Sequence, residues 1–332
     1  MTTTIFINGF GRIGRSVLRS VFEYGHEDIK IVGINDLSPN ETLAHLLRFD
    51  SVHGRFDGTV DVVDGGFNIN GQFVRVTSER DPANLPLDGV DVAMECTGYF
   101  TDREGATKLL SAGAKKVLIS APGKNADKTI VYGVNHDTLT AADTIVSNGS
   151  CTTNCLAPIA KVLNELCGIK SGYMTTIHAY TGDQSLHDGA HSDLYRARAG
   201  AMSMIPTTTG AAKAISLVLP ELTGKLEGSA IRVPTPNVSL IDLAFIPERD
   251  VTVAEIDAAM LAASNGAMKD VLSFEDAPKV SIDFNHTTTS SNYAQPQTCV
   301  TEAGLVRVVS WYDNEWGFSN RMIDTARVLN AL

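Results

Sequence analysis

The sequence has 332 residues, 43% of them hydrophobic, which is enough for two domains that fold without disulfide or membrane support. Its 27 basic and 38 acidic residues give a formal net charge of −11, so nucleic acid is not expected as a main partner. The 5 cysteines are too scattered for a disulfide framework, which predicts a cytoplasmic compartment, and no apolar stretch reaches the roughly 18 residues of a membrane span.

The first half of the chain alternates short β-branched runs with segments of helical period, which is typical of a parallel sheet covered by helices. The first strand is predicted at 5–8, a helix follows from Ile13 to the helix breaker Gly25, and a buried strand follows at 28–35. Another helix is predicted at 103–112. Further strands are expected at 73–76, 90–96, 117–120, 129–131 and 144–147.

The pattern changes near residue 150, where longer strands with few helices between them predict a second, α+β domain. Its strands, expected to form a large and mostly antiparallel sheet, are predicted at 172–179, 229–233, 238–245, 279–284 and 304–312. A polar stretch at 180–206 has little periodicity, and loops of this length are usually functional or disordered. Helical periods are found at 211–219 and 319–332. The predicted domains are 1–150 and 151–317.

A glycine-rich turn follows the first strand and precedes the first helix. Gly9, Gly11 and Gly14 match the GxGxxG pattern, whose glycines permit a tight turn, close approach to a pyrophosphate and close helix packing. Asp36 ends the second strand about 20 residues further on, where a carboxylate can bind two ribose hydroxyls and repel a 2′-phosphate. The plainer interpretation, that Asp36 only caps a turn, is less favoured after this pattern. The segment therefore predicts a domain that binds NAD.

A cysteine stands where the strand at 144–147 leads into an apolar segment. Ser150 is placed to cap a helix there, and a thiol at the helix start, Cys151, can have its pKa lowered to about 3.5–7.5. This predicts a thiolate at neutral pH. His178, near the end of the strand at 172–179, is the candidate partner that holds the thiolate and moves a proton. The other four cysteines are interpreted as core residues, because they do not complete a set of metal ligands.

Two groups of residues in the second domain suggest anion binding. Thr209 and Gly210 precede the helical segment at 211–219, where hydroxyls and backbone N–H groups can hold a phosphate. Arg196 in the long loop and Arg232 in a strand can supply forked contacts to a phosphate. Either arginine alone would be interpreted as a solvated surface residue. Together with the helix start they suggest a phosphorylated substrate.

Seven segments, in order across the whole chain, resemble the phosphorylating glyceraldehyde-3-phosphate dehydrogenase family. They are INGFGRIGR at 7–15, HLLRFDSVHGRF at 45–56, SNGSCTTNCLAP at 147–158, HAYTGDQ at 178–184, TGAAKA at 209–214, RVPTPNVS at 232–239 and WYDNEWGFSNR at 311–321. The resemblance implies that the Cys151 thiolate attacks an aldehyde to give a thiohemiacetal, while His178 takes the hydroxyl proton. Hydride transfer to NAD then leaves a thioester, which inorganic phosphate cleaves to the acyl phosphate.

The resemblance also implies the roles of the remaining residues. The dinucleotide would be held by Gly9, Gly11, Arg12, Ile13, Gly14, Asp36, Arg80, Ser120 and, at the nicotinamide carboxamide, Asn314. The attacking phosphate would be held by Ser150, Thr152, Thr209 and Gly210, and the phosphate of the substrate by Thr181, Arg196 and Arg232. A homotetramer is implied, with a Rossmann-type NAD-binding domain that the final helix, 318–332, joins. Its partners would be a small phosphorylated aldehyde and inorganic phosphate.

Three sites depart from the pattern of the family. Gly149 replaces the usual alanine beside the nucleophile and is expected to add backbone freedom, at a cost of up to roughly 1 kcal/mol. Phe318 stands where many members have tyrosine, which removes one hydroxyl near the nicotinamide. Gly189 and Ala190 replace a bulkier Leu-Pro pair, which opens space near the adenosine ribose. Some use of NADP beside NAD is therefore expected.

Two other functions are weighed against this one. Erythrose-4-phosphate dehydrogenase has the same fold but less need of a second anion site, so the presence of Thr181, Thr209 and Gly210 favours the triose substrate. A non-catalytic NAD-sensing or RNA-binding protein would use a dinucleotide fold without chemistry. The presence of Cys151 and His178 argues against that class.

Overall fold

The computed structural model describes residues 2–332. The chain forms two compact units. One contains the N-terminal part up to Gly149 together with Ser319–Leu332, and the other spans Ser150–Phe318. Within residues 2–332, no helix combines the length and the apolar character that crossing a membrane requires.

The first unit is built on one large sheet. In spatial order its strands are β10 (Lys128–Thr129), β11 (Ile145–Ser147), β9 (Lys116–Ile119), β8 (Val92–Glu95), β1 (Thr3–Asn8), β2 (Ile29–Asn35), β7 (Gln72–Thr77), β6 (Gly66–Ile69) and β5 (Val60–Val63). Neighbours from β10 to β7 are parallel, and β7, β6 and β5 pair antiparallel at one edge. Strands β3 (Phe49–Asp50) and β4 (Gly54–Arg55) form a separate pair. The carboxyl ends of β1, β2, β8 and β9 therefore meet at one edge, where α/β proteins bind ligands.

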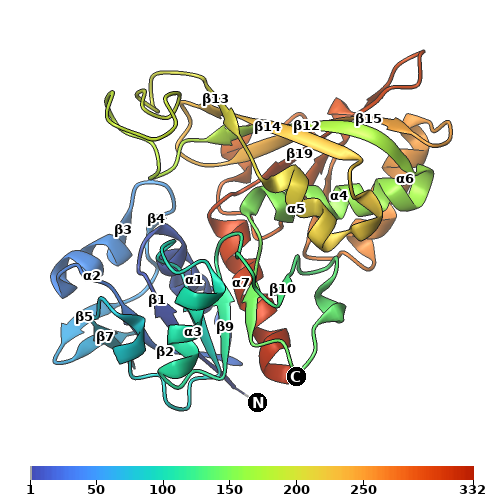
Figure 1. The fold of residues 1–332 in the computed structure, drawn as a ribbon. Helices are drawn as coiled ribbons and strands as arrows, with labels where there is room; N and C mark the ends of the chain where they lie inside the picture. The colour runs from blue at the N-terminus through green and yellow to red at the C-terminus, as the bar shows by residue number, and fades with distance from the viewer. Residues whose placement is uncertain (1) are drawn as a thin grey trace. The chain divides into compact units, whose positions relative to one another are not determined.

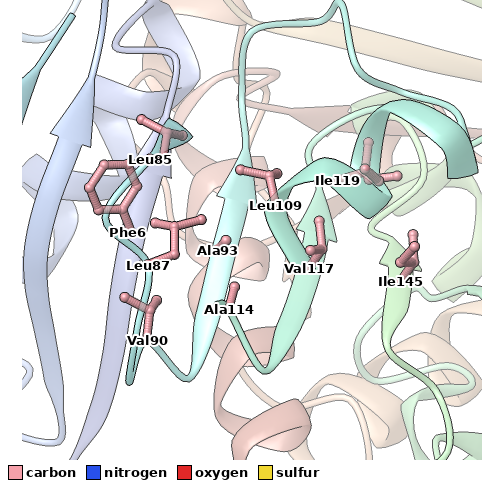
Figure 2. Close-up of a cluster of buried hydrophobic side chains, with 11 residues drawn as sticks. Phe6, Leu85, Leu87, Val90, Ala93, Leu109, Ala114, Val117, Ile119 and Ile145 are labelled. Atoms are coloured by element: carbon pink, nitrogen blue, oxygen red, sulfur yellow. The ribbon is translucent and has the colours of Figure 1, made fainter. Parts of the chain in front are cut away.

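Three helices of the first unit lie between its strands in the chain: α1 (Arg12–Glu23), α2 (Asn40–Arg48) and α3 (Arg103–Ser111) (Figure 1). Helix α3 packs against β9 and β11. Figure 2 shows the cluster under it, in which Leu109 of α3 meets Ala93 of β8 and Val117 of β9. The central strands are apolar along their length because parallel strands are covered on both faces.

The second unit is built on a mixed sheet. In spatial order its strands are β13 (Ile205–Thr208), β14 (Leu226–Val233), β12 (Ile169–Ala179), β15 (Ser239–Pro247), β19 (Val306–Tyr312), β17 (Ser291–Ala294) and β16 (Leu272–Glu275), with β18 (Cys299–Val300) beside β19. Only the pairs β12 with β14 and β16 with β17 are parallel among these described strands. On β15, Ile241, Leu243 and Phe245 are buried while the residues between them are partly exposed, so one face of the sheet carries the core.

Helices α4 (Cys151–Cys167), α5 (Ala211–Val218) and α6 (Val253–Asn265) pack on strands of this sheet (Figure 1). Helix α7 (Trp316–Ala331) ends the chain. Its residues from Ser319 onward belong to the first unit, where Ser20 Oγ donates to Asn320 Oδ1 at 2.9 Å and Asn330 Nδ2 donates to Thr3 Oγ1 at 3.0 Å. These bonds hold the last helix against α1 and the start of β1.

The predicted fold class, a Rossmann-type parallel sheet followed by an α+β domain with a mostly antiparallel sheet, is confirmed. The strand predicted at 279–284 is wrong, because Ser281–Phe284 forms a 3₁₀ turn in which Val280 N donates to Asp283 Oδ2 at 2.8 Å. A short carboxylate side chain here binds the local backbone in place of a sheet partner. The expectation of few helices missed α6, although its capping box, Thr252 with Glu255, is a visible start signal.

Candidate active site

The glycine-rich turn between β1 and α1 is shaped by close backbone contacts. Gly9 has φ of 98°, and a Cβ there would lie 2.6 Å from Thr97 N. A Cβ at Gly14 would lie 2.1 Å from Gly9 O, so only glycine lets the helix start so near the strand. At Gly11 a Cβ would meet no described atom within 4 Å, because it would point into open space. These are the three roles of the dinucleotide pattern: a tight turn, close packing and an unobstructed approach for a pyrophosphate.

That open space is a cavity of about 530 Å³ at the carboxyl ends of the strands of the first unit. It is lined by Asn8, Gly9, Gly11, Asn35, Asp36, Leu37, Glu79, Arg80, Cys96, Thr97, Tyr99 and Phe100. Four of the predicted dinucleotide residues, Gly9, Gly11, Asp36 and Arg80, are therefore brought together. The polar lining residues Asn8, Asn35 and Thr97 were missed. The sequence feature that could have identified them is a polar residue at the end of an apolar strand, or just after one.

The other predicted dinucleotide residues have different positions. Arg12 and Ile13 form the first turn of α1, and the Arg12 guanidinium is paired with the Asp50 carboxylate. The Arg12 side chain is thus engaged elsewhere, and the contact of the backbone of this turn with a phosphate stays a prediction. Ser120 follows β9, and its Oγ donates to Glu95 O at 2.9 Å. Asn314 belongs to the second unit.

Asp36 makes the turn-capping bond of the plainer interpretation and a second bond to the glycine-rich turn, while its contact with a ribose stays a prediction. Its Oδ1 accepts from Ser38 N at 2.9 Å, which is a turn-capping bond, and its Oδ2 accepts from Phe10 N at 3.0 Å. The second bond fixes the carboxylate against the glycine-rich turn. A carboxylate offers about four lone-pair sites, so about two remain for ribose hydroxyls.

The predicted nucleophile and its predicted base lie within the second unit. Ser150 caps α4 as predicted, with its Oγ accepting from Thr153 N at 3.0 Å, and Cys151 is the first residue of the helix. Cys151 Sγ lies 3.5 Å from His178 Nε2. His178, on β12, is only 4% exposed. The strand holds the imidazole at the start of the helix, so the thiol and the ring nitrogen can exchange a proton.

Arg232 lies beside His178 because the two residues are register partners on the parallel strands β14 and β12. His178 Nδ1 is 2.7 Å from Ala179 O and 2.7 Å from Arg232 Nη1, which itself donates to Ala179 O at 3.0 Å. A protonated Nδ1 donates to Ala179 O and leaves Nε2 free to accept a proton at Cys151 Sγ, whereas a bare Nδ1 accepts from Arg232 Nη1 and leaves the proton on Nε2. Only the first of these tautomers can act as a base toward the thiol.

Burial and Arg232 set the protonation of the pair. Burial, with the Arg232 charge added, lowers the pKa of His178 to about 3. Burial raises the pKa of the Cys151 thiol, which the Arg232 charge opposes. The sequence-based prediction of a lowered thiol pKa is therefore wrong for this structure, because loss of hydration outweighs the helix start. A neutral thiol beside a neutral imidazole is a pair in which the sulfur can pass its proton to the ring when it attacks an electrophile.

The predicted phosphate residues fall into two places. Arg196 Nε donates to Thr207 Oγ1 at 3.0 Å and its Nη1 to Asp183 at 2.6 Å, which places this arginine beside β13, just before Thr209 and Gly210 at the start of α5. Arg232 lies by His178, and its buried Nε has no hydrogen-bond partner among residues 2–332. An orphaned guanidinium donor next to the nucleophile fits an anionic substrate.

Two of the predicted phosphate hydroxyls are already engaged. Ser150 Oγ bonds Thr153, and Thr152 Oγ1 bonds the buried Tyr312 hydroxyl at 2.9 Å, which in turn bonds Thr176 Oγ1 at 2.9 Å. Thr181 lies at the start of the long loop, where its N–H donates to Gln184 Oε1 at 3.2 Å. The sequence reasoning missed Tyr312, which also meets the His178 ring edge-on, with centroids 5.9 Å apart.

The comparisons with known proteins agree with this geometry. The chain matches the models for the glyceraldehyde 3-phosphate dehydrogenase NAD binding domain over residues 3–103 and the C-terminal domain over residues 150–314. Curated glyceraldehyde-3-phosphate dehydrogenases from Xanthobacter flavus and Cereibacter sphaeroides are each 60% identical to it over 100% of both chains. That from Geobacillus stearothermophilus is 55% identical over 98% of each chain. The chain belongs to the glyceraldehyde-3-phosphate dehydrogenase family.

Two departures from the family pattern have a structural answer. Gly149 has φ of 66°, a region in which side chains with a Cβ are strained. The predicted cost of glycine is therefore wrong, because glycine relieves strain just before the nucleophile. Phe318 is buried, and the Asn314 amide is oriented without a tyrosine hydroxyl, since Ser239 Oγ donates to Asn314 Oδ1 at 2.9 Å. Gly189 and Ala190 lie exposed in the long loop.

Replacing Arg232 with glutamine tests whether its positive charge lowers the pKa of the Cys151 thiol. Without the positive charge the pKa of Cys151 is expected to rise further, so alkylation of the enzyme by iodoacetamide at neutral pH slows roughly tenfold for each unit of pKa. The rate would be followed from about pH 6 to about pH 9. Arg198→Gln, which removes an exposed loop arginine, is the matched control. Identical pH profiles for wild type and Arg232→Gln would refute this role.

Proposed function

We infer that the protein oxidises D-glyceraldehyde 3-phosphate to 1,3-bisphosphoglycerate with NAD and inorganic phosphate. The observation that carries this inference is the 3.5 Å contact of Cys151 Sγ with His178 Nε2 at the start of α4, in a chain of this family. The fit of NAD rests on the glycine cradle, where Gly11 opens into the cavity and Asp36 keeps two acceptor sites.

The covalent steps take place on Cys151. His178 Nε2 accepts the thiol proton as sulfur adds to the aldehyde carbon, and it returns that proton to the new oxyanion, which gives a thiohemiacetal. Nε2 then takes the hydroxyl proton as the carbonyl re-forms and a thioester is left on sulfur. A bound NAD would supply the acceptor for the hydride that leaves that carbon. An oxygen of inorganic phosphate attacks the thioester carbon, the C–S bond breaks, and sulfur regains a proton through His178.

Ala179 O and Arg232 have opposite effects on the stability of the His178 imidazolium. The carbonyl accepts from Nδ1–H and so stabilises the imidazolium that forms when Nε2 takes a proton. The guanidinium opposes that charge, so the imidazolium gives its proton up again readily. We propose that Thr181, Arg196 and Arg232 hold the phosphate of the substrate. We propose that Thr209, Gly210, Ser150 and Thr152 hold the attacking phosphate.

The activity is tested by NADH formation from glyceraldehyde 3-phosphate, with and without inorganic phosphate or arsenate. Turnover should require one of these anions, and the kcat/KM for glyceraldehyde 3-phosphate should exceed that for erythrose 4-phosphate. A clear preference for erythrose 4-phosphate would make the other dehydrogenase the right assignment. Binding of NAD without turnover of either aldehyde would support the non-catalytic class. Neither alternative is favoured, because the full-length relatives bear the triose dehydrogenase name.

We propose a cytoplasmic homotetramer as the working form. The support is the family, together with the absence of a membrane-spanning helix among residues 2–332. Sedimentation equilibrium of the purified protein tests the assembly, since a tetramer has four times the chain mass. A monomer or dimer at working concentration would reject this assembly.

Replacing Asp36 with asparagine tests the choice of cofactor. The change removes the charge that repels a 2′-phosphate and weakens the acceptor that meets Phe10 N. We expect the ratio of kcat/KM for NAD to that for NADP to fall about tenfold or more. Asp57→Asn, at an exposed position of the same unit, should leave the ratio unchanged. An unchanged ratio in Asp36→Asn would show that the preference lies elsewhere.

A further inference from the structure

A buried carboxylate that the proposed mechanism does not use lies beneath the dinucleotide cavity. Glu95 ends β8 and is 1% exposed, although it does not line the cavity itself. Its Oε2 accepts from Asn8 Nδ2 at 2.6 Å, and its Oε1 accepts from Thr97 N at 2.8 Å and from the Thr97 hydroxyl. None of these partners carries a charge. Burying a carboxylate without a cationic partner is costly, which favours a specific role for the hydrogen bonds that it accepts.

The hydrogen bonds that link Asn35, Asn8 and Glu95 all have their donor on the side away from Glu95. Asn35 Nδ2 donates to Asn8 Oδ1 at 2.8 Å, and Asn8 Nδ2 donates onward to Glu95. Asn35 is fixed in turn, because its Oδ1 accepts from Glu79 N at 2.8 Å and from Thr77 Oγ1 at 2.9 Å. An amide can turn either way, but an ionised carboxylate only accepts. The Asn8 amide is therefore oriented by Glu95 on one side and by Asn35 on the other, which links the ends of β8, β1 and β2.

The same carboxylate holds the wall of the cavity that comes after β8. Thr97 gives Glu95 both its N–H and its hydroxyl, and Thr97 Oγ1 accepts from Tyr99 N at 3.0 Å. Thr97 and Tyr99 line the cavity, and the Thr97 backbone is what a Cβ at Gly9 would strike. Ser120 Oγ donates to Glu95 O at 2.9 Å, so the end of β9 is tied to the same residue.

We propose that Glu95 is a positioning residue for NAD: its buried carboxylate holds the ends of β1, β2 and β8 and the Thr97 wall in the arrangement that receives the dinucleotide. The proposal rests on the proposed function only in taking NAD as the ligand of this cavity. It assigns Glu95 no contact with the substrate and no part in the chemistry at Cys151. Its loss should therefore change cofactor affinity and spare the reactivity of the thiol.

Glu95→Gln keeps the shape of the side chain and replaces one acceptor oxygen with an NH₂ group. That group must face another donor, either at Asn8 or at Thr97, and turning the Asn8 amide only moves the conflict to Asn35. A buried NH₂ group without an acceptor is destabilising. If the cavity wall at Thr97 shifts to relieve this conflict, NAD binding is expected to weaken about tenfold. We expect the Kd of NAD to rise about tenfold, with kcat at saturating NAD within about twofold of wild type.

The Kd of NAD would be measured by calorimetry on the full enzyme, and the reactivity of Cys151 by its rate of alkylation without NAD. Glu104→Gln, an exposed glutamate of α3, is the matched control. Thr97→Val keeps the volume but removes a hydroxyl that donates to Glu95 and accepts from Tyr99 N, so a rise of a few-fold in the Kd of NAD is expected. A Kd of NAD that is unchanged in Glu95→Gln would overturn the proposal. If Glu95→Gln does not fold, an unchanged Kd of NAD in Thr97→Val would overturn it. A wild type that binds NAD without turnover would instead refute the proposed function alone.

Discussion

Replacement of Cys151 by serine is expected to lower kcat by about 10³-fold or more. A serine hydroxyl at this place is held far more firmly as the neutral alcohol than a thiol, and His178 is too weak a base to remove its proton. The ester that would form is also a poorer acyl donor to phosphate than a thioester. Both halves of the reaction are therefore slowed.

The two halves can be measured apart. Rapid mixing of the enzyme with aldehyde and NAD, without phosphate, reports the NADH formed in the first turnover, and later addition of phosphate reports release of the acyl group. Cys299→Ser, which changes an exposed cysteine on β18, is the control and should keep full activity. A Cys151→Ser enzyme with a normal first turnover would remove Cys151 from the mechanism.

The central strands of the first unit were predictable because their local signals are strong, whereas α2 and the strands from β3 to β6 were not predicted. Apolar strands that each lead into a polar or glycine-rich turn fix β1, β2, β8 and β9, and the glycines at 9, 11 and 14 fix the turn between β1 and α1. The 3₁₀ turn at Ser281–Phe284 was missed since a β-branched run there is overruled by a carboxylate that caps its own backbone.

The site was predictable in its residue types but less so in its electrostatics. Cys151 at a helix start suggested a thiolate, but the pKa depends on burial, which no local pattern reveals. The roles of Glu95, Tyr312 and Ser239 were not recognised for the same reason, although all three residues lie in segments that the sequence analysis named. Each is defined by bonds to residues far away in the sequence, such as Glu95 with Asn8 and Tyr312 with Thr152.

Replacement of His178 by asparagine is expected to lower kcat by about 10²- to 10⁴-fold, because no other group lies at Nε2 to take the thiol and hydroxyl protons. The loss should persist across the pH range in which the wild-type enzyme is stable, since His178 is already neutral well below neutral pH. His187→Asn, at an exposed position of the long loop, is the control. A variant with wild-type kcat would show that a different base serves Cys151.

The same variant tests the protonation state through stability. His178 has a pKa of about 3 when folded and an ordinary value of 6.5 when unfolded, so the unfolded chain binds more protons between these values. The neutral buried ring thus contributes stability that is fully present above about pH 6.5 and is lost as pH falls toward about 3, by up to about 1.4 kcal/mol per pH unit. His178→Asn lacks this dependence, so its melting temperature should fall less steeply than that of wild type between about pH 7 and about pH 5. Parallel curves for the two proteins would mean that His178 is not buried in its neutral form.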